Sequence, residues 1–145
     1  MKALIQRVSG ASVKVKEELV GEISQGILLF LGVEKGDDKQ KADKLLEKVA
    51  KYRIFTDKDG RMNLSLRDIH GELLVVSQFT LVADTQKGLR PSFSSAGLPE
   101  ESNALYEYFV AQAAQLGLKV ATGRFGADMA VSLVNDGPVT FNLSV

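Results

Sequence analysis

Cysteine and tryptophan are absent from this chain of 145 residues, and histidine occurs once, as His70. Without cysteine the chain forms no disulfide and performs no thiolate chemistry, so nothing in it argues for an oxidising compartment. The opening residues lack the apolar run of a signal peptide, and no stretch approaches the roughly 20 apolar residues of a membrane span. We therefore expect a cytoplasmic protein that does not enter a membrane.

The formal net charge is zero, because eighteen Lys and Arg residues balance eighteen Asp and Glu residues. Nucleic-acid-binding proteins are usually basic, so the composition alone does not indicate one. The hydrophobic content of 45% is sufficient for one core in a chain of this length. The sequence has no repeats and no linker, and it predicts a single domain over residues 1–145.

Hydrophobic periodicity predicts a mixed α/β fold. Apolar residues recur at helical spacing twice, over Ala42–Ala50 after an aspartate cap and from Pro99 to a stop at Gly117. The run Ile27–Val33 is continuously apolar, which is typical of a central strand covered on both faces. Together these patterns predict a mixed sheet in a layered β/β/α domain with two main amphipathic helices. Further strands are predicted at 2–8, 13–16, 19–23, 53–56, 62–66, 118–122, 127–134 and 139–145, with a break at Ser9–Ala11 and a turn at Asn135–Pro138.

The stretch Glu72–Val82 combines a buried strand with polar groups at its end. Apolar residues 73–76 run directly into side chains that a core has no reason to hold, and such a strand end indicates a site. A second unusual stretch, Asn135–Thr140, has strand-like sequence on both sides and on its own is typical of a hairpin turn. We hypothesise that the two stretches meet. The residues of the first stretch that we assign to the site are Ser77, Gln78, Phe79 and Thr80.

The usual catalytic motifs are missing, which narrows the chemistry. The sequence has no metal-ligand cluster, no phosphate-binding or dinucleotide-binding glycine motif, and no Gly-x-Ser-x-Gly elbow. Asp57–Gly60 is similar to part of a calcium loop, but the glutamate that completes such a loop is missing. We expect neither a metal nor a cofactor. An enzyme made of these residues must rely on positioning and on backbone donors around a substrate that supplies some of the chemistry.

Residues 83–99 form a long stretch that is dense in turn-forming residues. Loops of this length inside a compact domain are usually functional or mobile. Lys87 and Arg90 are the only basic residues between Arg67 and Lys119. Two interpretations stay open for them: contact with a phosphate, or simply the solubility of the loop.

Three segments together resemble the D-aminoacyl-tRNA deacylase family, formerly the D-tyrosyl-tRNA deacylases. They are Ser77-Gln-Phe-Thr-Leu81, Asn135-Asp-Gly-Pro138 with Val139-Thr140, and the opening Met1–Val8. The likeness runs essentially from end to end and includes Arg90-Pro-Ser-Phe93. It implies a homodimer that hydrolyses the ester between a D-amino acid and the terminal adenosine of tRNA. The resemblance also implies editing of glycine misplaced on alanine tRNA.

The resemblance further implies the roles of substrate-binding residues. The Gly137–Pro138 peptide bond is expected to be cis and to reach from one subunit into the partner's active site. There its carbonyls accept from the α-amino group of the substrate and leave no room for an L side chain. Arg7 is expected to orient this segment, although an exposed strand arginine is the plain alternative. Phe125, Gly126, Ala127 and Met129 are expected on the adenine side of the site.

Catalysis is assigned to Gln78, Phe79 and Thr80, with Ser77 beside the substrate. Backbone N–H groups near Phe79 are expected to stabilise the oxyanion, while Gln78 orders the pocket. Thr80 as nucleophile needs a base, and the sequence offers none. We therefore hypothesise that the ribose 2′-hydroxyl of the tRNA activates water and that Thr80 only positions the substrate.

Two other functions stay open on the sequence. One is a binding module that holds tRNA ends or a small molecule without any reaction. The other is a metal-free hydrolase of a small ester or amide that is unrelated to tRNA.

Overall fold

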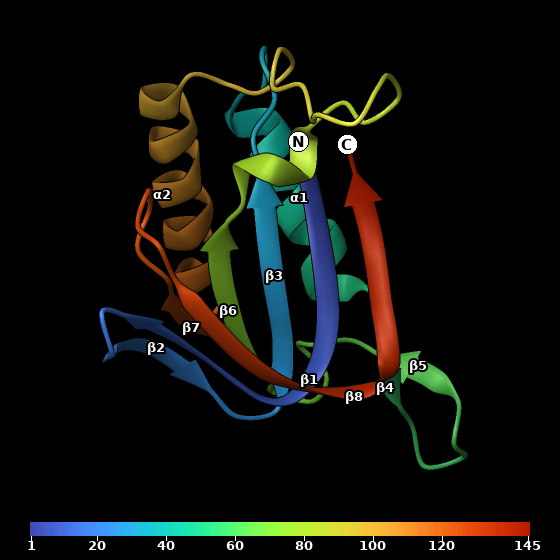
Figure 1. The fold of residues 1–145 in the computed structure, drawn as a ribbon. Helices are drawn as coiled ribbons and strands as arrows, with labels where there is room; N and C mark the ends of the chain where they lie inside the picture. The colour runs from blue at the N-terminus through green and yellow to red at the C-terminus, as the bar shows by residue number, and fades with distance from the viewer.

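A six-stranded sheet, a two-stranded hairpin and two α-helices make up the computed structural model, which describes all residues 1–145 (Figure 1). The mixed α/β class predicted from the sequence is confirmed. Neither helix combines the length and the hydropathy that a bilayer crossing requires. The elements in chain order are β1 (Lys2–Val15), β2 (Glu18–Ile23), β3 (Gly26–Gly32), α1 (Lys39–Lys51), β4 (Phe55–Thr56), β5 (Met62–Leu64), β6 (Glu72–Ser77), the 3₁₀ helix η1 (Phe79–Val82), α2 (Pro99–Gln115), β7 (Lys119–Thr122) and β8 (Ala130–Ser144).

The main sheet has the strand order β2-β1-β3-β6-β7, and β8 also pairs with β1. Strands β3, β6 and β7 run parallel to one another, whereas β1 is antiparallel to each of its three partners. Parallel neighbours need a crossover, and α1 and α2 lie in the two connections that supply it. The carboxyl ends of β3 and β6 therefore meet at one edge of the sheet, where Leu31 pairs with Ser77.

Strand β3 is buried on both faces, as its continuous apolar sequence predicted. Successive side chains of a strand point to opposite faces. Ile27 and Leu29 belong to the larger core cluster, which includes Leu45 of α1 and Phe109 of α2. Leu28 belongs to a second cluster, formed with buried residues of β1, β2 and β6. The sheet thus curls over itself on one side and is covered by helices on the other, which is the β/β/α layering expected.

Two predicted strand breaks are wrong, because β1 and β8 each stay paired with distant strands on both sides of the expected break. The interruption expected at Ser9–Ala11 does not occur, since Ala11 pairs with Ile23 of β2 and with Leu133 of β8. The turn expected at Asn135–Pro138 does not reverse the chain either. Strand β8 remains paired with β1 on both sides of it, and residues 136–139 bulge from the ladder opposite Arg7.

Local sequence explains where the other elements begin and end. Asp38 caps α1, and its side chain accepts from the Lys41 amide at 2.9 Å. Proline stands at the start of α2, where its missing N–H costs nothing, and two glutamates complement the helix dipole there. β4 begins at Phe55 and β5 ends at Leu64, so both are shorter than predicted, and β8 begins at Ala130, later than the predicted start at residue 127.

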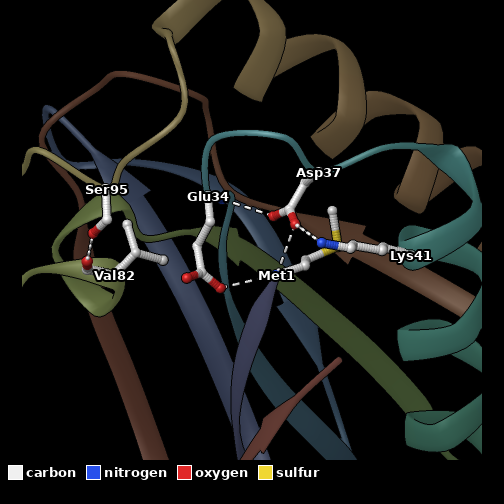
Figure 2. Close-up of polar contacts among 6 residues, drawn as sticks. All are labelled: Met1, Glu34, Asp37, Lys41, Val82 and Ser95. Atoms are coloured by element: carbon white, nitrogen blue, oxygen red, sulfur yellow. Dashed lines mark hydrogen bonds and ion pairs between the residues drawn. The ribbon is translucent and has the colours of Figure 1, made fainter.

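A partly buried ion-pair cluster fixes the turn that follows β3 (Figure 2). The Met1 ammonium lies 3.0 Å from Glu34 Oε1 and 2.9 Å from Asp37 Oδ1. The Asp37 carboxylate also accepts from the Glu34 N–H at 2.7 Å and lies 3.5 Å from Lys41 Nζ. Because the Asp37 side chain is only 1% exposed, this carboxylate needs all of its partners. We call Met1, Glu34, Asp37 and Lys41 the Asp37 cluster.

Replacing Asp37 by asparagine preserves the shape of the side chain but removes the charge opposite the Met1 ammonium. We expect Asp37→Asn to lose about 3 kcal/mol of unfolding free energy, as when one partner of a buried pair is removed. Urea denaturation measures this loss. The matched control is Glu47→Gln, whose exposed carboxylate pairs with Lys51 at 2.7 Å, and it should cause no measurable change. Equal losses in the two variants would contradict the assignment.

Candidate functional site

A pocket of about 490 Å³ opens at the carboxyl ends of β3 and β6. One wall continues from β6 into η1, and the facing wall is the loop before β8 with the first residues of β8. The segment that leads into α2 closes a third side. Most of the lining is apolar, and Asp128 is its one ionisable side chain. The lining residues are Leu31, Val33, Val76, Ser77, Gln78, Phe79, Ala96, Gly97, Pro99, Ser102, Phe125, Gly126, Ala127, Asp128, Met129 and Val131.

The wall formed by β6 and η1 presents backbone donors. The Gln78 N–H donates to the Leu31 carbonyl at 2.8 Å and ends the ladder between β3 and β6. The chain then turns into η1 at Phe79. The N–H groups of Phe79 and Thr80 donate to no oxygen of the chain, as is usual for the first amides of a helix. Two backbone N–H groups are therefore free at the start of η1, next to Gln78 and Phe79 of the pocket lining.

Thr80 lies differently from the residues before it. Its side chain is exposed and is not part of the pocket lining. Its hydroxyl oxygen accepts a hydrogen bond from the Gln78 side-chain amide. This contact holds the Gln78 side chain in place, and it gives Thr80 no general base as a partner. His70, the single histidine, lies in an exposed turn and outside the pocket.

The facing wall contains Phe125 and Met129, both half-buried. The Phe125 ring packs against Tyr106 of α2, with ring centroids 5.9 Å apart. Tyr106 donates to the Val75 carbonyl at 3.0 Å, and burial raises the pKa of its hydroxyl to about 12, opposed by a hydrogen bond with Thr122. Tyr106 is thus a neutral support behind the pocket wall rather than a base within it.

The Phe79 side chain stands at the mouth of the pocket. It is 60% exposed, and its ring lies 5.0 Å from that of Phe93, in the long connection between η1 and α2. Phe93 is itself exposed. An exposed pair of aromatic rings beside a pocket is unusual for a monomeric surface, and it links the site to the connection that follows it.

Residues 136–138 form a second constellation, held by two side chains. The Arg7 Nε–H donates to the Asp136 carbonyl at 2.8 Å, and the same guanidinium donates to the Ile54 carbonyl at 2.8 Å. The Asn135 amide donates to the carbonyls of Arg7 and Val139 at 2.9 and 3.1 Å. Arg7 is thus not a free strand arginine but orients this segment. The peptide bond between Gly137 and Pro138 is cis, as the resemblance implied, and both residues are exposed.

Within one chain the structure brings together some of the predicted site residues and not others. Seven of them line the pocket: Ser77, Gln78, Phe79, Phe125, Gly126, Ala127 and Met129. Residues 136–138 do not line it. They lie level with Arg7, which pairs with Ile27 near the start of β3, whereas the pocket lies beyond the other end of that strand (Figure 1). The two stretches that we expected to meet are therefore separate in a single chain.

Sequence reasoning missed Asp128, Ser102 and the Ala96–Gly97 wall. The tight approach at Gly97, where an added Cβ would lie 2.8 Å from Ser102 Oγ, explains the glycine at that position. None of these residues belongs to a motif or follows a strand, so no local pattern could single them out. Asp128 lies between two residues that were assigned to the site, and that position was the available signal.

The fold and the pocket define a mixed α/β protein with a preformed, largely apolar pocket next to two unpaired backbone N–H groups. Over residues 4–144 the chain matches the model of the D-Tyr-tRNA(Tyr) deacylase family, and it belongs to that family. A relative named D-aminoacyl-tRNA deacylase from Pseudoalteromonas translucida (strain TAC 125) is 68% identical, and one of the same name from Aeromonas hydrophila subsp. hydrophila is 65% identical. Both alignments cover 100% of each chain.

Solved structures share the fold over almost the whole chain. A structure named c-Myc DNA Unwinding Element Binding Protein has a TM-score of 0.95 and 36% identity, and the alignment covers 100% of this chain and 99% of that one. A second, described as "a probable eukaryotic D-amino acid tRNA deacylase", has a TM-score of 0.85 at 16% identity, with 99% and 98% covered. The second likeness bears on the fold alone.

Proposed function

We propose that the chain hydrolyses the ester bond of D-aminoacyl-tRNA, releasing the D-amino acid and free tRNA. Membership of the D-Tyr-tRNA(Tyr) deacylase family over residues 4–144 is the observation that carries the proposal. The relatives at 68% and 65% identity share the name D-aminoacyl-tRNA deacylase, which supports it. We extend the proposal to glycyl-tRNA(Ala), because glycine has no side chain for the site to reject. The proposed setting is the cytoplasm.

The free N–H groups of Phe79 and Thr80 are the proposed oxyanion donors. Fixed backbone donors aimed at the developing negative charge are among the strongest contributions to acyl transfer, and loss of one costs about 100- to 1,000-fold in rate. Gln78 supports this arrangement because its side chain lines the pocket and is held by Thr80. Ser77 adds a hydroxyl to the same wall, where it contacts the substrate in our proposal.

The reaction also needs a group that activates water, and we assign this role to the substrate. Thr80 has no basic partner, and its hydroxyl already accepts from Gln78. The 2′-hydroxyl of the terminal ribose is adjacent to the ester on the 3′-oxygen, so it needs no further positioning. Thr80 then holds Gln78 and the substrate in place. Phe125 and Met129 offer the apolar surface on which the terminal adenine packs.

We propose that a second copy of the chain completes the site. Residues 136–138 are exposed and are held rigidly by Arg7 and Asn135, yet they lie away from the pocket of their own chain. In a homodimer, carbonyls of Gly137 and Pro138 can enter the partner's pocket and accept from the α-amino group of the substrate. With the amine and the ester both fixed, an L side chain points into the protein, which gives selectivity by exclusion.

The first test compares aminoacyl-tRNAs that differ only in handedness. The purified protein should release D-tyrosine from D-tyrosyl-tRNA and glycine from glycyl-tRNA(Ala), and act on L-tyrosyl-tRNA at least about 100-fold more slowly. Release of label from acid-precipitable tRNA gives the rates. A protein that only binds tRNA would release none of these amino acids. A hydrolase of small esters would prefer a free D-tyrosine ester, and either outcome would refute the proposal.

The second test separates the 2′-hydroxyl from Thr80. Thr80→Ala should stay within about tenfold of the wild-type rate, because it loses only a positioning hydrogen bond. D-aminoacyl-tRNA that ends in 2′-deoxyadenosine should be hydrolysed about 100- to 10,000-fold more slowly, the usual contribution of a general base. Each rate is divided by spontaneous hydrolysis of the same ester, since the 2′-hydroxyl also affects that reaction. The reverse pattern would make Thr80 the nucleophile.

A further inference from the structure

Residues 84–92 form an arm that projects beside the pocket. Asp84 and Ser92 close it through two reciprocal backbone hydrogen bonds, of 2.8 and 3.0 Å. Inside the arm the Asp84 carboxylate accepts from the Gln86 N–H at 2.9 Å, and Gly88 turns the chain with a φ of +70°. Leu89 at the tip is fully exposed. Figure 1 shows the arm as a yellow loop that stands away from the end of the sheet.

The base of the arm is fixed to the pocket wall. The Ser95 hydroxyl donates to the Val82 carbonyl at 2.8 Å (Figure 2), and the Lys35 N–H donates to the Ser95 carbonyl at 3.0 Å. The Gly97 N–H donates to the Val33 carbonyl at 3.0 Å. These contacts attach the base of the arm to the turn that the Asp37 cluster holds. The segment that follows the arm is thus fixed to the pocket wall, and the Asp84–Ser92 pair closes the arm next to it.

The tip of the arm carries unpaired positive charge. Lys87 and Arg90 are both exposed, and neither takes part in any of the ion pairs of the structure. The only acidic residue of the arm, Asp84, lies at its base and is engaged by Gln86. Two cations on a projection with a closed base, with no acid beside them, form a site for negative charge.

The position of the arm decides which negative charge it can meet. Phe93, just after the arm, packs on Phe79 at the mouth of the pocket. Gly88 is four residues from each end of the arm, so the tip can stand at most about 14 Å from the Asp84–Ser92 pair. Successive nucleotides of one strand are about 3.4 Å apart when stacked, so this reach corresponds to about four nucleotides.

We propose that the arm binds the sugar-phosphate backbone of the tRNA strand next to its terminal nucleotide, with Lys87 and Arg90 on the phosphates. This inference rests on the proposed function, since it assigns the arm to the same substrate. The pocket recognises the aminoacyl end, and the arm recognises that this end belongs to a nucleic acid. Phosphate contacts of this kind position the strand and carry no sequence information.

The double variant Lys87→Ala/Arg90→Ala tests the proposal on two substrates. With D-aminoacyl-tRNA, KM should rise about tenfold near physiological salt, and the slope of log KM against log salt should fall by about 1.4 to 1.8, for two lost phosphate contacts. With 3′-D-aminoacyl-adenosine, which has no phosphate, kcat/KM should remain that of the wild type. If Lys87 and Arg90 instead support the structure of the pocket, the double variant should lose activity on both substrates, and that result would overturn the proposal.

A matched control carries the same loss of charge elsewhere. Lys44 and Lys48 are exposed on α1, take part in none of the ion pairs of the structure, and belong to a helix that does not line the pocket. Lys44→Ala/Lys48→Ala should leave both KM and the salt slope unchanged. An equal effect of the two double variants would mean that net charge, and not the arm, attracts the tRNA, and would overturn the inference.

The outcomes separate the arm from the proposed function. If the wild type deacylates D-aminoacyl-tRNA but the arm variant keeps its KM and salt slope, the inference about the arm is wrong and the function stands. If the wild type deacylates nothing, the proposed function is wrong. The role of the arm is then tested by measuring the affinity of the wild type, the arm variant and the control for uncharged tRNA. Equal binding by all three would then overturn the arm as well.

Discussion

Burial of β3 and β6 on both faces is the constraint on which the site depends. Because helices cover one face and the curled sheet covers the other, neither strand carries a polar side chain between its two ends. Polar side chains occur only at the strand ends, and the pocket lies at the carboxyl ends, next to Leu31 and Ser77. There the ladder stops at Gln78, and the turn into η1 leaves the amides of Phe79 and Thr80 without acceptors. The backbone donors of the proposed oxyanion site thus follow from the way in which a buried sheet must end.

Strand β8 links this edge of the sheet to the segment proposed to select handedness. It begins at the pocket, where Val131 lines the wall, and then follows β1 to the bulge opposite Arg7. Arg7 and Asn135 hold that bulge outward, at a distance from the pocket of the same chain. The proposed site therefore requires two chains, because each chain supplies one pocket and inserts its bulge into the pocket of the other. Closed twofold symmetry makes such an exchange reciprocal.

The sequence predicts those elements whose pattern reflects burial alone. It fails where pairing between distant strands determines whether a strand continues. The apolar run Ile27–Val33 and the two helices were predicted correctly, because their periodicity reflects burial directly. Gly10 and Gly137–Pro138 looked like breaks in the sequence. Pairing with β2 and β8 keeps β1 continuous through Gly10, and pairing with β1 on both sides keeps β8 continuous past Gly137–Pro138. For the site, the polar strand end at Ser77 marked the pocket. Asp128 was missed, because it lies in a loop without a motif and reaches the pocket only through the tertiary fold.

Mixing two defective subunits tests most directly whether two chains build each site. Phe79→Pro removes one proposed oxyanion donor at a helix start, where proline is tolerated. Gly137→Ala forces the bulge to shift, because the added Cβ would press against the Val139 backbone nitrogen. Each homodimer should be nearly inactive, but after unfolding and refolding of an equal mixture, about a quarter of wild-type deacylation should return, since half of the dimers carry one intact site. No recovery in refolded mixed dimers would contradict the account.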